Sequence, residues 1–368
     1  MFYSNRLLSF EEFIKYFNEE NKLYTQIDAT ADQIDFFKKL TFSVIHGHDI
    51  ILGSSEVVSK IKPKDVSISD YSNVIDAIIK SRSKIGIYTS GTTRDPRVHY
   101  HTIQNLIRNV KYDSRDATWV SAYNLSHMAF LQVYFQAILN RNLLISVYSY
   151  QQEQIREVFN KFNVTNITGT PSFYRLLETN INGTSVQTIT LGGERAEKKL
   201  FDRLKSLFPN AKIRNIYAST EAGYLLSSEG EFFTIKPSLK DLVKIVDSEI
   251  IIHNSLLATD MIANNIWYKT GDIVEFTNDS TSKFKIIGRR SDIINVGGEK
   301  ISLNDVESLI MEIEFIKDVR AYAIKNSVVG NIIGIDVVVE NDEFKNEITI
   351  TKKMSELMPS HIIPRVIN

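Results

Sequence analysis

Residues 85–97 read IGIYTSGTTRDPR. The first four residues are mostly apolar and β-prone, and a loop of small hydroxyl residues, one glycine and then cations follows them. Hydroxyl and loop N–H groups donate hydrogen bonds to phosphate oxygens, and a glycine lets the backbone approach a ligand closely. The alternative is a solvated turn rich in Ser and Thr. Arg97 adds charge and a donor fork. The predicted phosphate-binding residues are Thr89, Ser90, Gly91, Thr92 and Thr93.

The composition limits the classes of protein to which this chain can belong. At about 150 residues per domain, 368 residues allow two or three domains. The net charge of -1 gives no overall attraction to nucleic acid or anionic lipid. Because the chain has no cysteine, thiolate metal sites, disulfides and a cysteine nucleophile are excluded. No apolar run approaches the roughly 20 residues of a membrane span, and the N-terminus does not resemble a secretory signal. We expect a cytoplasmic protein that binds neither nucleic acid nor membrane.

Short β-prone runs alternate with helical stretches through the first two thirds of the chain, which predicts a largely parallel α/β sheet. The predicted strands are Ile85–Thr89, Trp119–Ala122, Leu143–Val147, Asn166–Gly169, Thr188–Leu191 and Ile213–Tyr217. The predicted helices are Thr102–Lys111, Met128–Leu139, Gln152–Phe162, Ser172–Asn180 and Glu197–Phe208. Two earlier helices are predicted by capping boxes, one at Ser9 and Glu12 and one at Thr30 and Gln33.

From about residue 232 short strands dominate, and a basic, glycine-bearing turn follows at Gly288–Asp292. Beyond it come two helices, near Leu303–Glu312 and Glu347–Leu357, and two β-prone runs between them. We therefore predict a large α/β body with mixed sheets and helices at residues 1–287. A hinge at 288–291 and a small α+β domain at 292–368 complete the prediction.

Five segments in order resemble motifs of the adenylate-forming superfamily of AMP-binding enzymes, which includes acyl-CoA synthetases, aryl-acid ligases and nonribosomal peptide adenylation domains. The segments are YTSGTTRDPR after the first strand, LGGERAEKKLFDRLKSLFP at Leu191–Pro209, NIYASTEAG at Asn215–Gly223, WYKTGD at Trp267–Asp272 and IIGRRSDIINVGGEKISLNDVE at Ile286–Glu307. The resemblance implies a large N-terminal body and a small C-terminal cap.

It also implies a reaction in two halves. A small carboxylic acid attacks the α-phosphate of ATP in the presence of Mg2+, which gives an acyl-adenylate and pyrophosphate. The thiol of CoA or of a carrier protein's phosphopantetheine then takes the acyl group, and the sequence leaves these two acceptors open. The oligomeric state is open as well.

The resemblance assigns nucleotide and metal roles to particular residues. Thr220 would face the α-phosphate, Arg97 would hold pyrophosphate, and Glu221 is a hard oxygen ligand suited to Mg2+. The expected adenine- and ribose-binding residues are Gly192, Gly193, Glu194, Tyr217, Asp272 and Arg289.

The acyl pocket is expected at SAYNLSHMAF, residues Ser121–Phe130, with Tyr123, Asn124 and His127 in its wall. Members that activate α-amino acids usually place an aspartate at the position of Asn124. An amide cannot balance a buried ammonium, so Asn124 favours an aryl acid or another acid that is not an α-amino acid.

The hinge is expected at Arg290 and Ser291, where a small polar residue can absorb a backbone rotation. Gly297 and Gly298 would border the pantetheine path, and Lys300 would meet a phosphate. The family lysine near the C-terminus has no counterpart in these residues, so we expect slow adenylation alongside feasible thioester formation. A catalytically weakened adenylate-binding partner or scaffold protein, and a freestanding amino-acid adenylation domain, are the alternatives.

Overall fold

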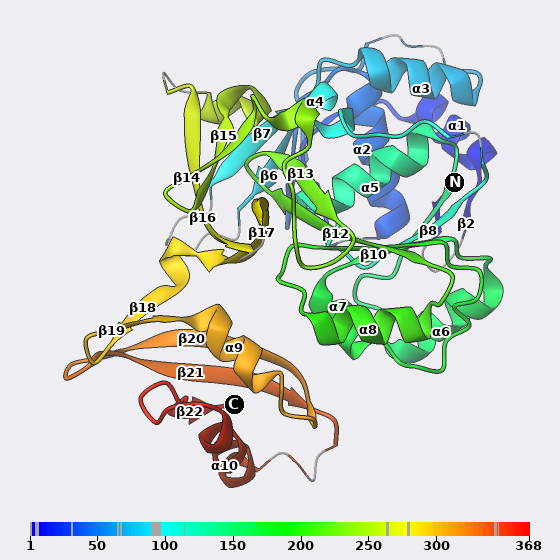
Figure 1. Cartoon of the computed structure of the whole chain (residues 1–368). Helices are drawn as coiled ribbons and strands as arrows, with labels where there is room; N and C mark the ends of the chain where they lie inside the picture. Colours follow the sequence, from blue (N-terminus) through cyan, green and yellow to red (C-terminus); the bar gives the residue numbers. More distant parts are fainter. Residues whose placement is uncertain are drawn as a thin grey trace.

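The computed structural model describes residues 2–3, 7–30, 32–64, 66, 68–89, 97–113, 115–262, 265–277, 280–341, 344 and 346–368. Four β-sheets with flanking helices make up this described part, as Figure 1 shows. Mixed sheets and helices are the α/β fold class that the sequence predicts.

The largest sheet has the strand order β13-β12-β11-β10-β8-β9-β1-β2. Its strands are β1 (Phe2–Tyr3), β2 (Leu7–Leu8), β8 (Thr118–Ser121), β9 (Leu143–Ser146), β10 (Asn166–Gly169), β11 (Thr188–Gly192), β12 (Lys212–Ser219) and β13 (Gly223–Ser228). In this spatial order, the strands from β12 through to β1 pair in parallel with one another. At the two edges, β13 is antiparallel to β12 and β2 is antiparallel to β1. The prediction of a largely parallel sheet is confirmed.

A second sheet forms earlier in the chain, with the order β5-β3-β4-β6-β7. Its strands are β3 (Tyr24–Asp28), β4 (Ile50–Gly53), β5 (Val57–Val58), β6 (Lys84–Tyr88) and β7 (Val98–Thr102). Strands β3 and β4 escaped the sequence prediction because each is short and lies next to a strongly helical segment. Strands β6 and β7 pair antiparallel, so the predicted phosphate loop connects a hairpin.

Two further sheets follow in the second half of the chain, and their strand pairs are antiparallel except for β21 and β22, which pair in parallel. The third sheet contains β14 (Val243–Val246), β15 (Glu249–His253), β16 (Trp267–Thr277) and β17 (Ser280–Arg289). The fourth contains β18 (Ile293–Val296), β19 (Glu299–Ser302), β20 (Ile316–Asn326), β21 (Gly330–Val339) and β22 (Val366–Ile367).

The α-helices cover these sheets on several faces. They are α1 (Phe10–Glu19), α2 (Gln33–Ile45), α3 (Tyr71–Lys80), α4 (Ile103–Ile107), α5 (Met128–Leu139), α6 (Gln152–Lys161), α7 (Pro171–Leu176), α8 (Lys198–Leu207), α9 (Leu303–Ile310) and α10 (Glu347–Leu357). Short 3-10 turns lie at η1 (Pro237–Leu239), η2 (Asn254–Leu256), η3 (Thr259–Met261) and η4 (Arg290–Asp292). Helices α4 and α7 end earlier than predicted.

The capping predictions had different outcomes. The box at Ser9 and Glu12 is present at the start of α1. The predicted box at Thr30 and Gln33 is wrong, because Asp32 caps α2 by accepting a hydrogen bond from the Asp35 N–H. A carboxylate two residues further along is an equally good cap.

Apolar side chains gather in separate clusters on the two faces of the large sheet. Helices α6, α7 and α8 pack on one face, and α5 and α2 lie on the other (Figure 1). The cluster under β18–β22 contains only residues between Ile294 and Ile363 among its buried members. The division at 288–291 is consistent with this self-contained cluster and stays a prediction.

Candidate functional site

The predicted phosphate loop begins and ends on adjacent strands. The N–H of Thr89 donates to the carbonyl of Arg97 at 2.9 Å, which closes the base of the β6–β7 hairpin. Ser90, Gly91, Thr92 and Thr93 lie outside the described residues. Thr89 and Arg97 are thus brought together at the base of this loop.

The buried side chains of Tyr217 and Asp272 and the exposed side chain of Arg289 form a polar cluster that joins β12, β16 and β17. The Tyr217 hydroxyl donates to Asp272 Oδ2 at 2.5 Å, and Arg289 Nε donates to Asp272 Oδ1 at 3.1 Å. Asp272 on β16 and Arg289 on β17 are cross-strand partners, which fixes their meeting. Burial raises the pKa of the Asp272 carboxyl, and the two donors oppose that shift. Each oxygen retains an acceptor position for a further donor.

The expected adenine-binding role of Tyr217 stays a prediction. Its side chain lies in the apolar cluster beside β12 and β13 and is buried. The side chains of Tyr217 and Asp272 are not among the residues that line the neighbouring cavity, whereas Arg289 is. The structure therefore places the Tyr217 hydroxyl on the carboxylate and the ring in the core.

His101 holds the turn between β12 and β13 in place by hydrogen bonding. This turn carries Thr220 and Glu221. His101 Nε2 lies 2.7 Å from the Thr220 carbonyl oxygen and Nδ1 lies 2.9 Å from Asn105 Nδ2. A carbonyl only accepts, so Nε2 carries the proton and Nδ1 accepts from the amide. Burial lowers the pKa of His101 to about 4, which keeps the ring neutral. These two bonds give His101 a structural role in the turn.

Arg108 holds the same turn from α4's C-terminal side. Its guanidinium donates to the carbonyl of Ala222, to that of Tyr224 at 2.9 Å and to that of Leu256 at 3.1 Å. Sequence reasoning missed Arg108, because an arginine at a helix end usually faces solvent. A run of carbonyl acceptors from distant segments leaves no pattern in the sequence.

Glu221 lies close to this cluster. Its negative charge contributes to the raised pKa of Arg289 and to that of Tyr268, a half-buried tyrosine that the sequence analysis did not single out. Among the described residues, no group of three His, Asp or Glu side chains is placed to hold a metal ion. Proteins nevertheless usually bind Mg2+ through only one or two carboxylates, and the phosphates of the substrate supply further oxygens. Glu221 fits that role.

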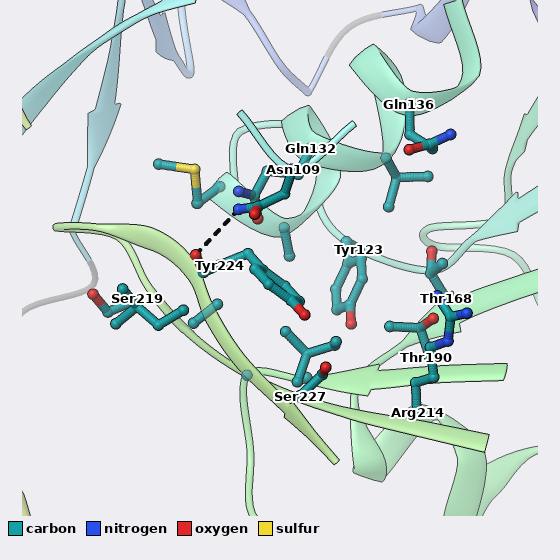
Figure 2. Close-up of a pocket in the computed structure, with 18 of the residues that line it drawn as sticks. Asn109, Tyr123, Gln132, Gln136, Thr168, Thr190, Arg214, Ser219, Tyr224 and Ser227 are labelled. Atoms are coloured by element: carbon teal, nitrogen blue, oxygen red, sulfur yellow. Dashed lines mark hydrogen bonds between the residues drawn. The ribbon is translucent and has the colours of Figure 1, made fainter. Parts of the chain in front are cut away.

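A cavity of about 960 Å³ opens beside this cluster, between α5 and the face of β10, β11 and β12 opposite α6–α8. Figure 2 shows Tyr123 in its middle, with Ser219 on one side and Arg214 on the other. The predicted site residues that line it are Tyr123, His127, Gly192, Gly193, Glu194, Thr220 and Arg289. Its volume is that of a site for a small organic ligand.

The glycine segment after β11 forms part of the wall. A Cβ at Gly192 would lie 3.3 Å from the Tyr123 hydroxyl, and Gly193 has a φ of +90° that side chains rarely adopt. The Glu194 carboxylate accepts from the backbone N–H and the hydroxyl of Ser172, at 2.9 and 2.7 Å. These contacts explain why this turn contains two glycines and an acidic residue.

Asn124 is not among the residues that line the cavity, and its place in the acyl pocket stays a prediction. Asn124 Oδ1 accepts from the N–H and hydroxyl of Ser126, both at 2.9 Å, and Nδ2 donates to the Tyr148 hydroxyl at 3.0 Å. Asparagine favours such local turn bonds over a ligand position. Its neighbours Tyr123 and His127 do reach the cavity.

The predicted hinge and pantetheine residues lie outside the cavity wall. Arg290 pairs with the buried Glu249 at 3.1 Å, and the Ser291 hydroxyl donates to Asp292 at 3.1 Å. Gly297 and Gly298 form the turn between β18 and β19, with φ of +61° and +98°. Lys300 is exposed on β19. The structure does not bring these three residues to the cavity.

Sequence reasoning also missed the basic side chains in the cavity wall away from Thr220. They are Lys111, Lys212, Arg214 and Lys236. They come from three separate parts of the chain, so no local run of charged residues predicts that they lie together.

No helix in the described part of the chain has the length and apolar character needed to cross a membrane.

Comparisons with known proteins agree with the fold and with the motifs. Residues 79–249 match the family described as AMP-binding enzyme. The 2-succinylbenzoate–CoA ligase of Listeria monocytogenes is 25% identical over 322 residues, 77% of this chain. The chain spans 66% of that protein's length and the same share of VraA, a relative from Staphylococcus epidermidis that is 22% identical.

Solved structures of such enzymes have the same fold. The o-succinylbenzoate CoA synthetase of Bacillus subtilis, in complex with its acyl-adenylate, superimposes with a TM-score of 0.70 at 16% identity, covering 100% of this chain and 91% of that one. The anthranilate CoA ligase AuaEII, in complex with anthranoyl-AMP, gives 0.72 at 12% identity, with 100% and 89% coverage. The five ordered motifs, the match of residues 79–249 and the shared fold all support the resemblance to the AMP-binding enzyme superfamily.

Proposed function

We propose that the protein activates a carboxylic acid with ATP as an acyl-adenylate and passes the acyl group to a phosphopantetheine thiol. The proposal rests on one observation: a polar cluster and a cavity lie next to each other. The Tyr217–Asp272–Arg289 cluster provides charged and polar groups for a nucleotide. The adjoining cavity of about 960 Å³ provides room for an acid; Arg289 belongs to both features, and Thr220 lines the cavity.

In the first half-reaction the acid's carboxylate oxygen attacks the α-phosphorus, and the bond to the bridging oxygen of pyrophosphate breaks. The acid is already ionised near neutral pH, so no general base is required. Catalysis of phosphoryl-type displacement depends on positioning and on neutralising charge. The Thr220 hydroxyl and the N–H groups of the loop after Thr89 are the donors that we assign to the phosphate oxygens.

The rigidity of the Thr220 turn supports this role. His101 and Arg108 fix its carbonyls, so Thr220 keeps its orientation when a ligand arrives. A preorganised donor does not have to reorganise during the reaction. Glu221 is the residue that we assign to Mg2+, which when bound supplies positive charge beside the phosphates. Asp272 and Arg289 are assigned to the ribose.

In the second half-reaction the thiol sulfur attacks the acyl carbon, AMP leaves with the bonding electrons, and the thiol proton passes to solvent. CoA and a carrier protein supply the same thiol chemistry. The 2-succinylbenzoate and anthranilate ligases act on aryl acids, as their names state, which supports an acid other than an α-amino acid as the substrate here.

The test separates the two half-reactions on the full 368-residue chain. Acid-dependent exchange of labelled pyrophosphate into ATP reports adenylation, and thioester formation from a synthetic acyl-adenylate and CoA reports transfer. Activity in either assay with an aryl or acyl acid supports the proposal. If the protein binds an adenylate but shows neither activity, the alternative of an adenylate-binding partner protein is correct.

A further inference from the structure

The floor of the cavity carries a row of polar side chains that ends in an arginine. Thr168 on β10 pairs with Thr190 on β11, and Thr190 pairs with Arg214 on β12. Residues in register across a sheet point to the same face. The alternate row of Ile167, Ile189 and Ile213 faces α6–α8, so the polar row faces the cavity. Figure 2 shows Thr168, Thr190 and Arg214 grouped together, away from Ser219.

Three lysines join Arg214 at this end of the cavity. Lys111 follows α4, Lys212 lies on β12, and Lys236 precedes η1. Lys212 is paired with Glu229, and Lys236 donates to the Ser227 hydroxyl at 3.4 Å. Within the part of the chain that the structure describes, Lys111 and Arg214 form no salt bridge.

The four cations are near enough to affect one another. The positive charge of Arg214 is the largest cause that lowers the pKa of Lys111, with burial and the charges of Lys236 and Lys212 adding to it. Glu229, which also lines the cavity, offsets part of this mutual repulsion through Lys212 and Arg214, and the remainder destabilises the empty site. An anion placed among these groups would relieve it.

We propose that the Arg214 end of the cavity binds a second anionic group of the acid, so that the substrate is a dianion of which a dicarboxylate is the simplest example. This inference rests on the proposed function. The guanidinium fork matches a carboxylate with two parallel hydrogen bonds, and the hydroxyls of Thr168 and Thr190 stand beside it.

The position of Arg214 along β12 separates this site from the nucleotide. Ser219 lies five positions after Arg214, which at about 3.3 Å per residue gives roughly 16 Å. The phosphates that Thr220 would contact are therefore at the opposite end of the strand. The acid's reacting carboxylate belongs at that end, and its second anion belongs at Arg214.

The experiment compares dicarboxylates with their monomethyl esters, which keep the shape and lose one charge. Terephthalate, phthalate and adipate are paired with their monoesters in an acid-dependent hydroxamate assay and in binding calorimetry without ATP. Arg214→Met removes the charge and Arg214→Lys keeps it. Lys205→Met, an exposed cation on α8, is the matched control.

We expect wild type to favour at least one diacid over its monoester by about tenfold or more, in kcat/KM and in affinity. Arg214→Met should abolish that ratio, Arg214→Lys should retain part of it, and Lys205→Met should leave it intact. Added salt should weaken diacid binding, because the lysines are partly exposed. A ratio unchanged in Arg214→Met, or no diacid bound more tightly than its monoester, overturns the inference.

The turnover and binding measurements also distinguish the proposed acid activation from the proposed dianion site. Turnover of monoesters without any diacid preference contradicts the dianion site and leaves acid activation standing. Diacid binding that depends on Arg214, without turnover of any acid, contradicts acid activation and supports the anion site.

Discussion

At the scale of single residues, Asp272 is the group on which nucleotide binding depends most directly. Asp272→Asn keeps the size of the side chain and removes the charge that Arg289 and Tyr217 face. A hydrogen bond to a charged group is worth about 1.5–3 kcal/mol, so we expect the KM for ATP to rise about tenfold or more. Steady-state kinetics measure the change. Asp202→Asn, at an exposed position on α8, is the control, and an equal KM in both variants would contradict the assignment.

His101 gives a prediction for the dependence of stability on pH. Its pKa is about 4 in the folded protein and about 6.5 in an unfolded chain. Between these values the unfolded chain binds a proton that the folded protein does not, so stability falls as the pH drops from 6.5 towards 4. This group accounts for at most about 3 kcal/mol of that loss. Urea unfolding of wild type and His101→Gln at pH 7 and pH 5 should show a smaller pH-dependent loss for the variant. Equal losses would show that His101 is not the titrating group.

At the scale of elements, the joint between α4 and the β12–β13 turn depends on Arg108. Arg108→Lys keeps the charge but cannot reach several carbonyls at once. We expect the free energy of unfolding to fall by about 2 kcal/mol, because buried carbonyls lose their donor. Denaturant unfolding measures this loss. Arg115→Lys, an exposed arginine paired with nearby Asp113, should change stability by less than about 0.5 kcal/mol. Equal losses of unfolding free energy in the two variants would contradict the proposal that Arg108 holds α4 to the β12–β13 turn.

The elements that the sequence predicted well are those whose pattern is local. Helix α5 and strand β10 have the predicted bounds, because an apolar helix and a buried strand each depend on their own residues. Tyr123 and Gly192, which belong to motifs of fixed spacing, line the cavity, and their binding roles stay predictions. The place of Asn124 in the acyl pocket stays a prediction, because no sequence pattern distinguishes its turn bond to Ser126 from a contact with a ligand. The proximity of Arg214 and Lys111 could not be predicted from the sequence, because it depends on how the large sheet and the loop after α4 lie in the fold.

At the scale of the whole molecule, Arg175 of helix α7 forms an ion pair with the fourth sheet. Arg175 donates to Asp318 on β20 at 2.8 Å and to Glu197 at 2.8 Å, and its side chain is 12% exposed. Helix α7 thus belongs to the large sheet and is bridged to the C-terminal unit by charge.

Asp318→Asn should loosen that contact. We expect faster amide hydrogen exchange in α7 and β20, with exchange in β12 unchanged, because weakening one buried partner frees the local contact before the whole fold. Glu340→Gln, an exposed change just after β21, is the control. Unaltered exchange in both α7 and β20 would show that the ion pair does not hold the two parts together.

The most direct test of the account is acid-dependent exchange of labelled pyrophosphate into ATP, measured across aryl, acyl and dicarboxylic acids with wild type and Asp272→Asn. The account predicts exchange that requires an acid and falls about tenfold or more in the variant at limiting ATP. Absence of exchange with every acid, together with no thioester formed from a supplied adenylate, would contradict it.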